Sequence, residues 1–213
     1  MPITINGSGT ITGISAGGLP DNCVTAADLA TTLDLSSNTV TLPSGTGGKI
    51  LQVVSTQYET PNSVSHGAVT HVDLPFSVNI TPTTSTSLML VSFSIEGEVG
   101  NLPWGSMAAF SRTISGTRTV VLPTTSYGSR LPGIVSWADT FGPTDNDSSP
   151  GGFYLHMFPD SNRPANTSQI TYTPTMACSI AATFYINRNV GDSVDGVNSE
   201  RGISWITVME VAA

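Results

Sequence analysis

The sequence predicts a mainly β protein in which an N-terminal arm and a short helix precede an antiparallel β-sandwich. The first observation is composition: only 10% of the 213 residues are charged, against roughly 25% in ordinary soluble domains. Glycine, serine, threonine, asparagine and proline crowd the chain instead, which favours short strands joined by many turns. The second is that apolar and polar residues alternate with a period of two from Lys49 onward, as in half-buried strands.

The clearest predicted strand spans 89–98, where four apolar residues face one way and Ser92, Ser94, Glu96 and Glu98 face the other. Similar runs occupy 50–58, 68–80, 107–114, 117–122, 134–138, 152–158, 169–173, 178–187 and 202–211. Prolines, Pro174 among them, are expected to separate the strands. Strands at this spacing predict a sandwich with jelly-roll-like or related topology over residues 49–213.

Residues 1–24 are predicted to form a hairpin-like arm. Ile3 and Ile5 alternate with polar residues, and the following Asn-Gly-Ser-Gly supplies turn chemistry. The arm holds too few apolar side chains to offset a backbone ordering cost of about 1–2 kcal/mol per residue. We therefore expect another molecule to hold it in place.

Residues 25–48 are predicted to contain a short helix, a strand and a flexible linker. Thr25 is placed as the helix N-cap, and Leu29 and Leu33 fall on one face. Isolated helices shorter than about 12–15 residues rarely persist in water. Either three copies pack Leu29 and Leu33 around an axis, which we favour, or the helix covers its own chain's sheet.

Charge and hydropathy exclude several classes of protein. The formal net charge is −8 and Lys49 is the only lysine, so no basic patch for nucleic acid is expected. The first residues show no basic region followed by an apolar run, so we expect no signal peptide, and no run reaches the roughly 18 apolar residues that cross a bilayer. We expect synthesis in the cytoplasm and no membrane insertion. Cys23 and Cys178 lie far apart in unlike contexts, and Cys178 is expected to be a buried thiol.

No catalytic residue and no cofactor is predicted, so we expect the protein not to be an enzyme. Glu96 and Glu98 lie two apart on one predicted strand, which puts their carboxylates about 6–7 Å apart, within the glycosidase range. Any two glutamates so spaced share this geometry, and we expect both on an exposed face. The three histidines lack the spacing of a metal site.

Two loops offer candidate binding residues. Asp145 and Asp147 present oxygens at alternate positions and are a weak calcium candidate, with a solvated turn as the alternative. Trp104 and Tyr127 lie in loop-like contexts and are the candidates for receptor contact, because their rings offer a flat face to a sugar and a polar handle beside it. Burial at a subunit contact is the alternative. Trp205 lies in a strand pattern and is expected in the core.

Three segments carry a family resemblance: ITINGSGTITGI with GGLPD at 3–14 and 17–21, GKILQVV at 48–54, and ISWITVMEVAA at 203–213. The first resembles the N-termini of tail-fibre proteins in phages of aquatic bacteria. The second resembles the entry into their C-terminal domain, and the third is similar to the way such chains end.

The resemblance implies a homotrimer in the virion, at the tail or head. The arm would dock on other phage virion proteins, and the C-terminal domain would attach to a host surface glycan or protein. The principal alternative is a capsid decoration or head-fibre protein that stabilises the shell. A further alternative is a polysaccharide depolymerase that uses Glu96 and Glu98.

Overall fold

In the computed structural model, the described residues are 50–100, 105–124, 128–137, 151–191 and 201–213. The chain divides into two compact units, Met1–Gly47 and Gly48–Ala213, and every described residue belongs to the second. The predicted arm and the segment with Leu29 and Leu33 therefore lie outside the described residues.

The described part of the chain forms twelve strands and no helix. In chain order the strands are β1 (Ile50–Tyr58), β2 (Asn62–His66), β3 (Val72–Asp73), β4 (Val78–Ile80), β5 (Leu88–Val99), β6 (Ser106–Ile114), β7 (Thr117–Val121), β8 (Val135–Trp137), β9 (Gly151–Pro159), β10 (Ile170–Cys178), β11 (Ala182–Ile186) and β12 (Ser204–Val211). Within these ranges no helix has the length and apolar character that a membrane crossing needs. The predicted β class is confirmed.

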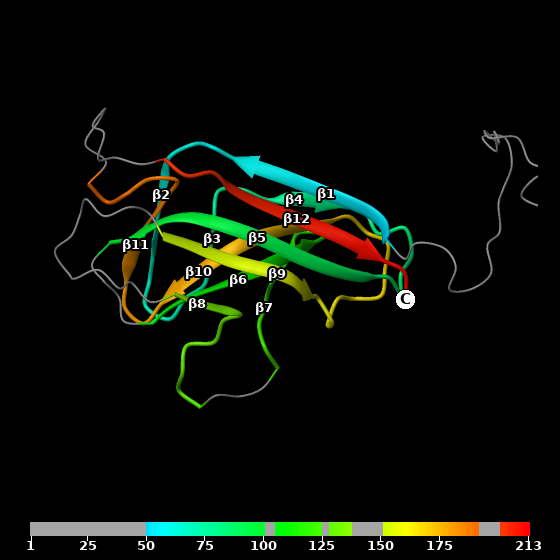
Figure 1. Ribbon diagram of the computed structural model, residues 1–213. Coiled ribbons are helices and arrows are strands. Elements are labelled where there is room, and N and C mark those ends of the chain that lie inside the picture. Colours follow the sequence, from blue (N-terminus) through cyan, green and yellow to red (C-terminus); the bar gives the residue numbers. More distant parts are fainter. Residues whose placement is uncertain (1–49, 101–104, 125–127, 138–150, 192–200) are drawn as a thin grey trace, which may run out of the picture. The chain divides into compact units, whose positions relative to one another are not determined.

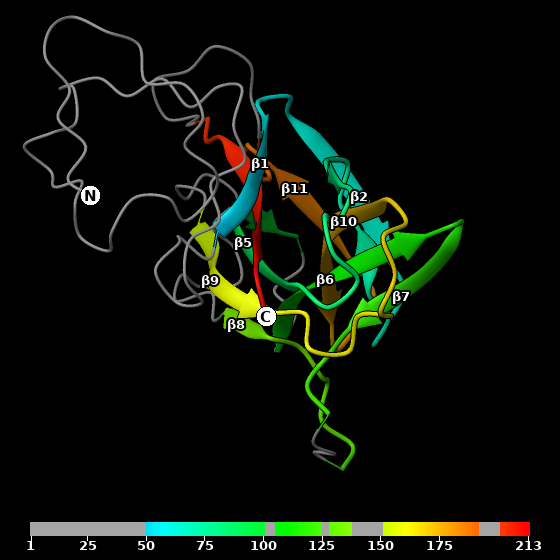
Figure 2. The same ribbon diagram turned by 90° about the vertical axis from the view of Figure 1, so that its right-hand side faces the viewer.

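The strands form two antiparallel sheets. The first sheet has the order β1-β12-β5-β11-β2. In addition, β9 pairs with β5 along the edge opposite to β12. Figure 1 shows the long β5 running between β12 and β9. The second sheet has the order β3-β10-β6-β7, with β4 also pairing β10 and β8 also pairing β6. In Figure 2 the β6–β7 hairpin extends away from β1, β5 and β9.

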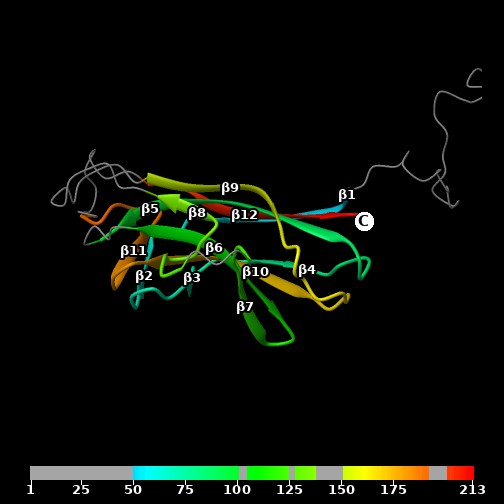
Figure 3. The same cartoon turned by 90° about the horizontal axis from the view of Figure 1, so that it is seen from below.

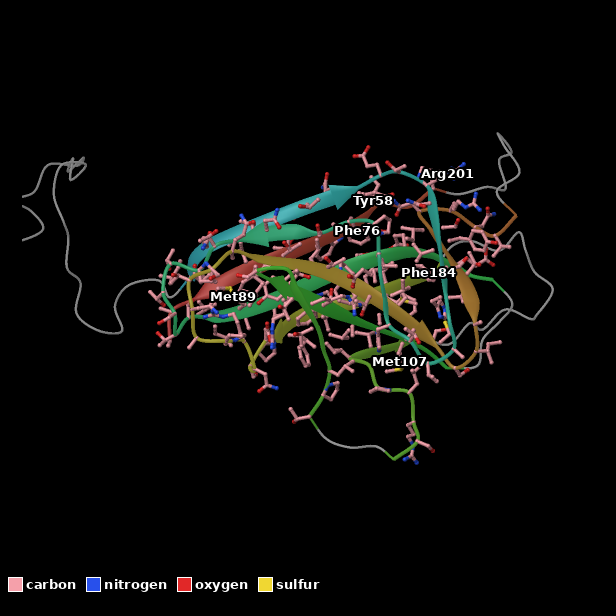
Figure 4. All side chains as sticks on the ribbon, turned by 180° about the vertical axis from the view of Figure 1, so that it is seen from behind. Tyr58, Phe76, Met89, Met107, Phe184 and Arg201 are labelled. Atoms are coloured by element: carbon pink, nitrogen blue, oxygen red, sulfur yellow. The ribbon has the colours of Figure 1, made fainter. Side chains whose placement is uncertain are left out.

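The inner faces of the two sheets share one hydrophobic core, so the architecture is a β-sandwich. Phe110 of β6 packs edge-to-face on Phe158 of β9, with ring centroids 6.2 Å apart, and so joins the sheets. At the end of β1, the ring of Tyr58 stacks on Phe76 with centroids 5.4 Å apart (Figure 4). The predicted inward set of β5 is confirmed, because Met89 and Phe93 are 0% exposed.

At the beginning of the domain one predicted strand was wrong and one strand was missed. The single strand expected at 68–80 is two short strands, β3 and β4, because Pro75 lies between them and cannot donate to a ladder. Strand β2, which pairs with β11, was not predicted, because its sequence, Asn-Ser-Val-Ser-His, contains a single aliphatic residue.

Pro174 was expected to end a strand, but β10 continues through it. The carbonyl oxygen of Pro174 accepts a hydrogen bond from the amide of Leu74, 2.9 Å away. Because the nitrogen and oxygen of one strand residue point to the same side, the Pro174 nitrogen faces the break between β3 and β4. No hydrogen bond of the ladder is lost there.

A buried carboxylate near the end of β12 accepts hydrogen bonds from β1 and from the residues between β4 and β5. Glu210 is 0% exposed, and its oxygens accept hydrogen bonds from Gln52 Nε2 at 2.6 Å, Ser87 Oγ at 2.5 Å, and the amide and hydroxyl of Thr83 at 2.8 and 2.9 Å. Burial alone would raise the pKa of Glu210. The hydrogen bonds from Ser87, Gln52 and Thr83 outweigh burial and lower that pKa to about 2.

A buried ion pair links β6 to the residue that follows β9. Arg112 donates from Nη1 to Asp160 and from Nη2 to the carbonyl oxygen of Asn162, 2.8 Å away. The hydroxyl of Tyr172 donates to the other oxygen of Asp160 at 2.9 Å. Burial raises the pKa of both Asp160 and Tyr172. Each charged group therefore has a partner, as buried charges require.

Candidate functional site

The outer face of the first sheet carries a row of side chains that crosses four strands. The register aligns Gln57 of β1 with Trp205 of β12, Trp205 with Ser94 of β5, and Ser94 with Tyr154 of β9. These four residues, named here the aromatic row, lie on the opposite side of their strands from the residues that face the core, and Ser94 among them is only 3% exposed. Figure 1 shows the four strands side by side.

Glu96 adjoins the aromatic row on β5. Its Oε1 accepts hydrogen bonds from the hydroxyl of Tyr154 at 2.7 Å and from Ser94 Oγ at 3.1 Å. The Tyr154 side chain is 52% exposed. The hydrogen bond to Glu96 raises the pKa of Tyr154, because the neutral phenol is the hydrogen-bond donor. A phenol and a carboxylate are thus fixed together on an accessible surface.

Two glycines make room for this pair. A Cβ at Gly152 would lie 2.4 Å from the Tyr154 hydroxyl oxygen and 2.5 Å from Cζ of the same ring, so the ring lies over Gly152. A Cβ at Gly202 would lie 2.5 Å from Cβ of Glu96. Both sites exclude any larger residue unless the pair moves. The two glycines therefore permit the observed positions of Tyr154 and Glu96.

A buried polar network supports the strands beneath Glu96. The Glu96 amide donates to Ser204 Oγ at 3.1 Å, Ser204 Oγ donates to Asn187 Oδ1 at 2.7 Å, and Asn187 Nδ2 donates to the carbonyl oxygen of Tyr58 at 2.7 Å. Ser204 and Asn187 are 0% and 1% exposed. The network links β1, β5, β12 and the residue after β11, and so keeps this end of the sheet rigid.

A row of hydroxyl groups lies next to the aromatic row on the same face. The register aligns Ser55 with Thr207 and Thr207 with Ser92, and the hydroxyl oxygens of Ser55 and Thr207 are 2.8 Å apart. The Oγ of Ser92 accepts a hydrogen bond from the amide of Met157 at 2.9 Å. This part of the face is polar but uncharged.

The arrangement suits the binding of a sugar. The rings of Trp205 and Tyr154 offer flat apolar faces, and each carries a polar atom at its edge. Glu96 supplies acceptor oxygens and Gln57 supplies both a donor and an acceptor for hydroxyl groups. The aromatic row and Glu96 together contain one charged side chain, a carboxylate, so a ligand rich in hydroxyls and C–H faces fits these groups better than an anion.

The sequence did not identify this site. Trp205 was expected in the core, but it is half-buried on the outer face, because the core positions of β12 belong to Ile206 and Val208. Tyr154 was not singled out at all. The signal lies in the register between four strands distant in sequence, which periodicity within one strand does not contain.

The predicted site residues lie elsewhere in the chain. The following are all outside the described residues: Trp104, Tyr127, Leu29, Leu33, Asp145 and Asp147. Among the residues that the structure does describe, no group of three histidine, cysteine, aspartate or glutamate side chains is placed to hold a metal ion.

The expectation that Glu96 and Glu98 share an exposed face was wrong. Glu98 is only 4% exposed, and its Oε2 accepts a hydrogen bond from the amide of Val190 at 2.5 Å. The residues after β11 cover it. The carboxylate of Glu96 therefore stands on the accessible face without that of Glu98.

Two of the histidines and Cys178 lie at separate places in the domain. His71 bridges Thr175 Oγ1 at 3.0 Å and the carbonyl oxygen of Pro132 at 2.8 Å, and burial lowers its pKa. His156 is exposed on β9. Cys178 is a buried free thiol, as predicted, with its sulfur 3.3 Å from Ser106 Oγ.

Comparisons with known proteins give no family. No protein-family model matches the sequence, and no curated protein matches it. Among solved structures, the chain is similar to one described as the crystal structure of infectious bursal disease virus VP2 subviral particle, with 11% identity and a TM-score of 0.29. The match covers 76% of this chain and 37% of the VP2 chain, so this chain spans little more than a third of its length. A likeness this distant carries no inference about function.

Proposed function

We propose that the chain is an adhesive structural component of a phage virion, a trimeric tail fibre that binds carbohydrate on the host surface. The observation that carries the proposal is the aromatic row with Glu96. It places two aromatic side chains, a carboxylate and an amide on the outer face of a rigid sheet, where a sugar ring can approach.

The order of the strands supports a role of this class. Eight strands, β1, β4, β5, β6, β7, β9, β10 and β12, make two sets with the orders β1-β12-β5-β9 and β4-β10-β6-β7. Consecutive strands pass from one set to the other except at the β6–β7 hairpin. We assign this order to a jelly roll, an architecture used by viral capsid and lectin domains. Because a fold does not fix a function, the argument depends on the site.

The role is binding and not catalysis. Hydrolysis of a glycosidic bond generally needs two carboxyl groups on either side of the bond, and Glu98 is buried beside the amide of Val190. Adhesion would instead be multivalent. Three weak sites on one fibre raise the avidity by orders of magnitude when they engage together.

The test is binding of the recombinant chain to immobilised bacterial surface polysaccharide, together with blocking of phage adsorption. The proposal expects binding, an elution volume of a trimer, and loss of binding in Trp205→Ala. Glycan hydrolysis by the natural chain that Glu96→Gln abolishes would contradict it in favour of a depolymerase.

A capsid decoration or head-fibre protein is the second candidate. The apolar residues Val53, Met209 and Leu90, which are aligned across the same outer face, favour it, because such a surface packs against protein. Particles without this protein would then lose thermal stability while they adsorb normally. If the chain is a fibre, particles without it should keep their thermal stability and lose adsorption.

A further inference from the structure

The outer face of the first sheet has an apolar end, where β1 begins and β12 finishes. Met209 lies opposite both Val53 and Leu90, and Val211 lies opposite both Ile50 and Leu88. Figure 3 shows the C-terminus beside the start of β1. The apolar end consists of Ile50, Leu51, Val53, Leu88, Leu90, Pro159, Met209 and Val211.

The apolar end is accessible to another molecule. The exposed fractions of Ile50, Leu51, Val53 and Leu88 are 55%, 41%, 53% and 36%. A register shift between Ile50 and Gln52 leaves both Ile50 and Leu51 exposed. Single exposed apolar residues are ordinary, but a contiguous patch marks an interaction surface.

The charge of the chain makes the apolar end the surface at which two copies can meet with the least repulsion. Each copy carries a formal net charge of −8, so most contacts between copies would bring like charges together. The apolar end contains no charged side chain among its eight residues, and the adjacent hydroxyl row is uncharged too. A basic partner would instead bind where acidic groups lie, and the apolar end has none.

The path of the chain favours a second copy as the occupant. Forty-nine residues precede Ile50, and they join the domain at the apolar end. In the proposed trimer, Leu29 and Leu33 in this segment hold the copies together. The same end of each domain is then tethered close to the others, which raises the effective concentration of the apolar ends.

We propose that the apolar end packs against a second copy of the chain, an inference that rests on the trimer of the proposed function. The aromatic row stays open in this arrangement. Gln57 lies four residues beyond Val53 on β1, which is about 13 Å at 3.3 Å per residue. Each copy thus presents a sugar site beside the contact and not within it.

The test compares the mass of full-length variants by sedimentation equilibrium. Leu51→Glu with Val53→Glu puts two negative charges in each copy's apolar end and is expected to weaken association by at least about tenfold. Ile180→Glu with Val69→Glu is the matched control, because these residues are 46% and 66% exposed and lie outside the apolar end. It should keep the mass of the natural chain. An unchanged mass in the first variant would overturn the proposal, as would a monomeric natural chain.

Cross-linking gives a second readout that does not depend on stability. In Cys23→Ser with Val53→Cys, a short bismaleimide should join two copies through the new cysteine, while Ile180→Cys in the same background should stay uncoupled. Failure of Val53→Cys to couple would count against the contact. Binding to immobilised polysaccharide separates the two proposals. A monomer that binds through Trp205 refutes the trimer and the contact but keeps the sugar site. An oligomer that does not bind refutes only the sugar site.

Discussion

The hydroxyl of Tyr154 on β9 donates a hydrogen bond to Oε1 of Glu96 on β5, across 2.7 Å. The two residues are 58 positions apart in sequence, and antiparallel pairing of Ser94 with Tyr154 brings them together. The contact fixes the orientation of an exposed aromatic ring, and the sugar-binding account depends on that orientation.

The Tyr154–Glu96 hydrogen bond should be visible in the titration of the phenol. The carboxylate raises the pKa of Tyr154, so Glu96→Gln should lower that pKa toward its usual value. Phenolate absorbance of the natural chain and Glu96→Gln measures this, and Tyr154→Phe identifies the signal by difference. Superimposable titrations of the natural chain and Glu96→Gln would show that no such hydrogen bond forms.

Gly152→Ala should displace the Tyr154 ring. The new Cβ would lie 2.4 Å from the Tyr154 hydroxyl oxygen, so the side chain must rotate and lose its contact with Glu96. The expected result is a phenol pKa closer to that of Glu96→Gln and weaker binding to polysaccharide. Gly67→Ala is the matched control, because its Cβ would meet nothing closer than Thr70 Oγ1 at 4.0 Å, and it should change neither quantity.

Glu210→Gln should reduce stability and its dependence on pH. At neutral pH the cost is about 1.5–3 kcal/mol, the usual range for hydrogen bonds to a charged group. The pKa of Glu210 falls from 4.5 to about 2 on folding, so between these values the unfolded chain binds the extra proton and the natural protein loses stability as the pH drops. Urea unfolding at neutral and acidic pH measures this. If the free energy of unfolding of Glu210→Gln still falls steeply as the pH drops, groups other than Glu210 cause the acid dependence.

Asp160→Asn should destabilise the fold more than Tyr172→Phe. The first variant leaves Arg112, which is 8% exposed, buried without its counter-charge, at a cost of about 3–5 kcal/mol. The second removes one hydrogen bond to a carboxylate that Arg112 still holds, at a cost of about 1.5–3 kcal/mol. Both free energies of unfolding come from urea titration. Equal losses would mean that the ion pair contributes no more than the phenol.

Period-two alternation within a strand predicted most of the sandwich. It placed Met89, Val91, Phe93 and Ile95 on one face of β5, and all four are buried. It failed where the strand had few apolar residues, as in β2, and where partner strands decided the outcome, as at Pro174. The break between β3 and β4, opposite Pro174, is a feature of the neighbouring strands and not of β10.

The site depended on information that one strand does not hold. Trp205 and Ile206 are consecutive in sequence, and both are apolar enough for a core. Only the pairing of β12 with β1 and β5 assigns Ile206 to the core and Trp205 to the outer face. The sequence predicted the aromatic contacts for a sugar at Trp104 and Tyr127, which lie outside the described residues. The site that we propose instead uses Tyr154 and Trp205 on the sheet face.

Binding of the full-length chain to an array of bacterial surface oligosaccharides tests the central claim most directly. The natural chain should bind a subset of the glycans. Trp205→Ala and Tyr154→Ala should each lose binding by at least about tenfold, or about 1.4 kcal/mol, as truncation of a central aromatic contact does. Circular dichroism should show both variants folded. Full binding by folded Trp205→Ala and Tyr154→Ala, or no glycan bound by the natural chain, would contradict the account.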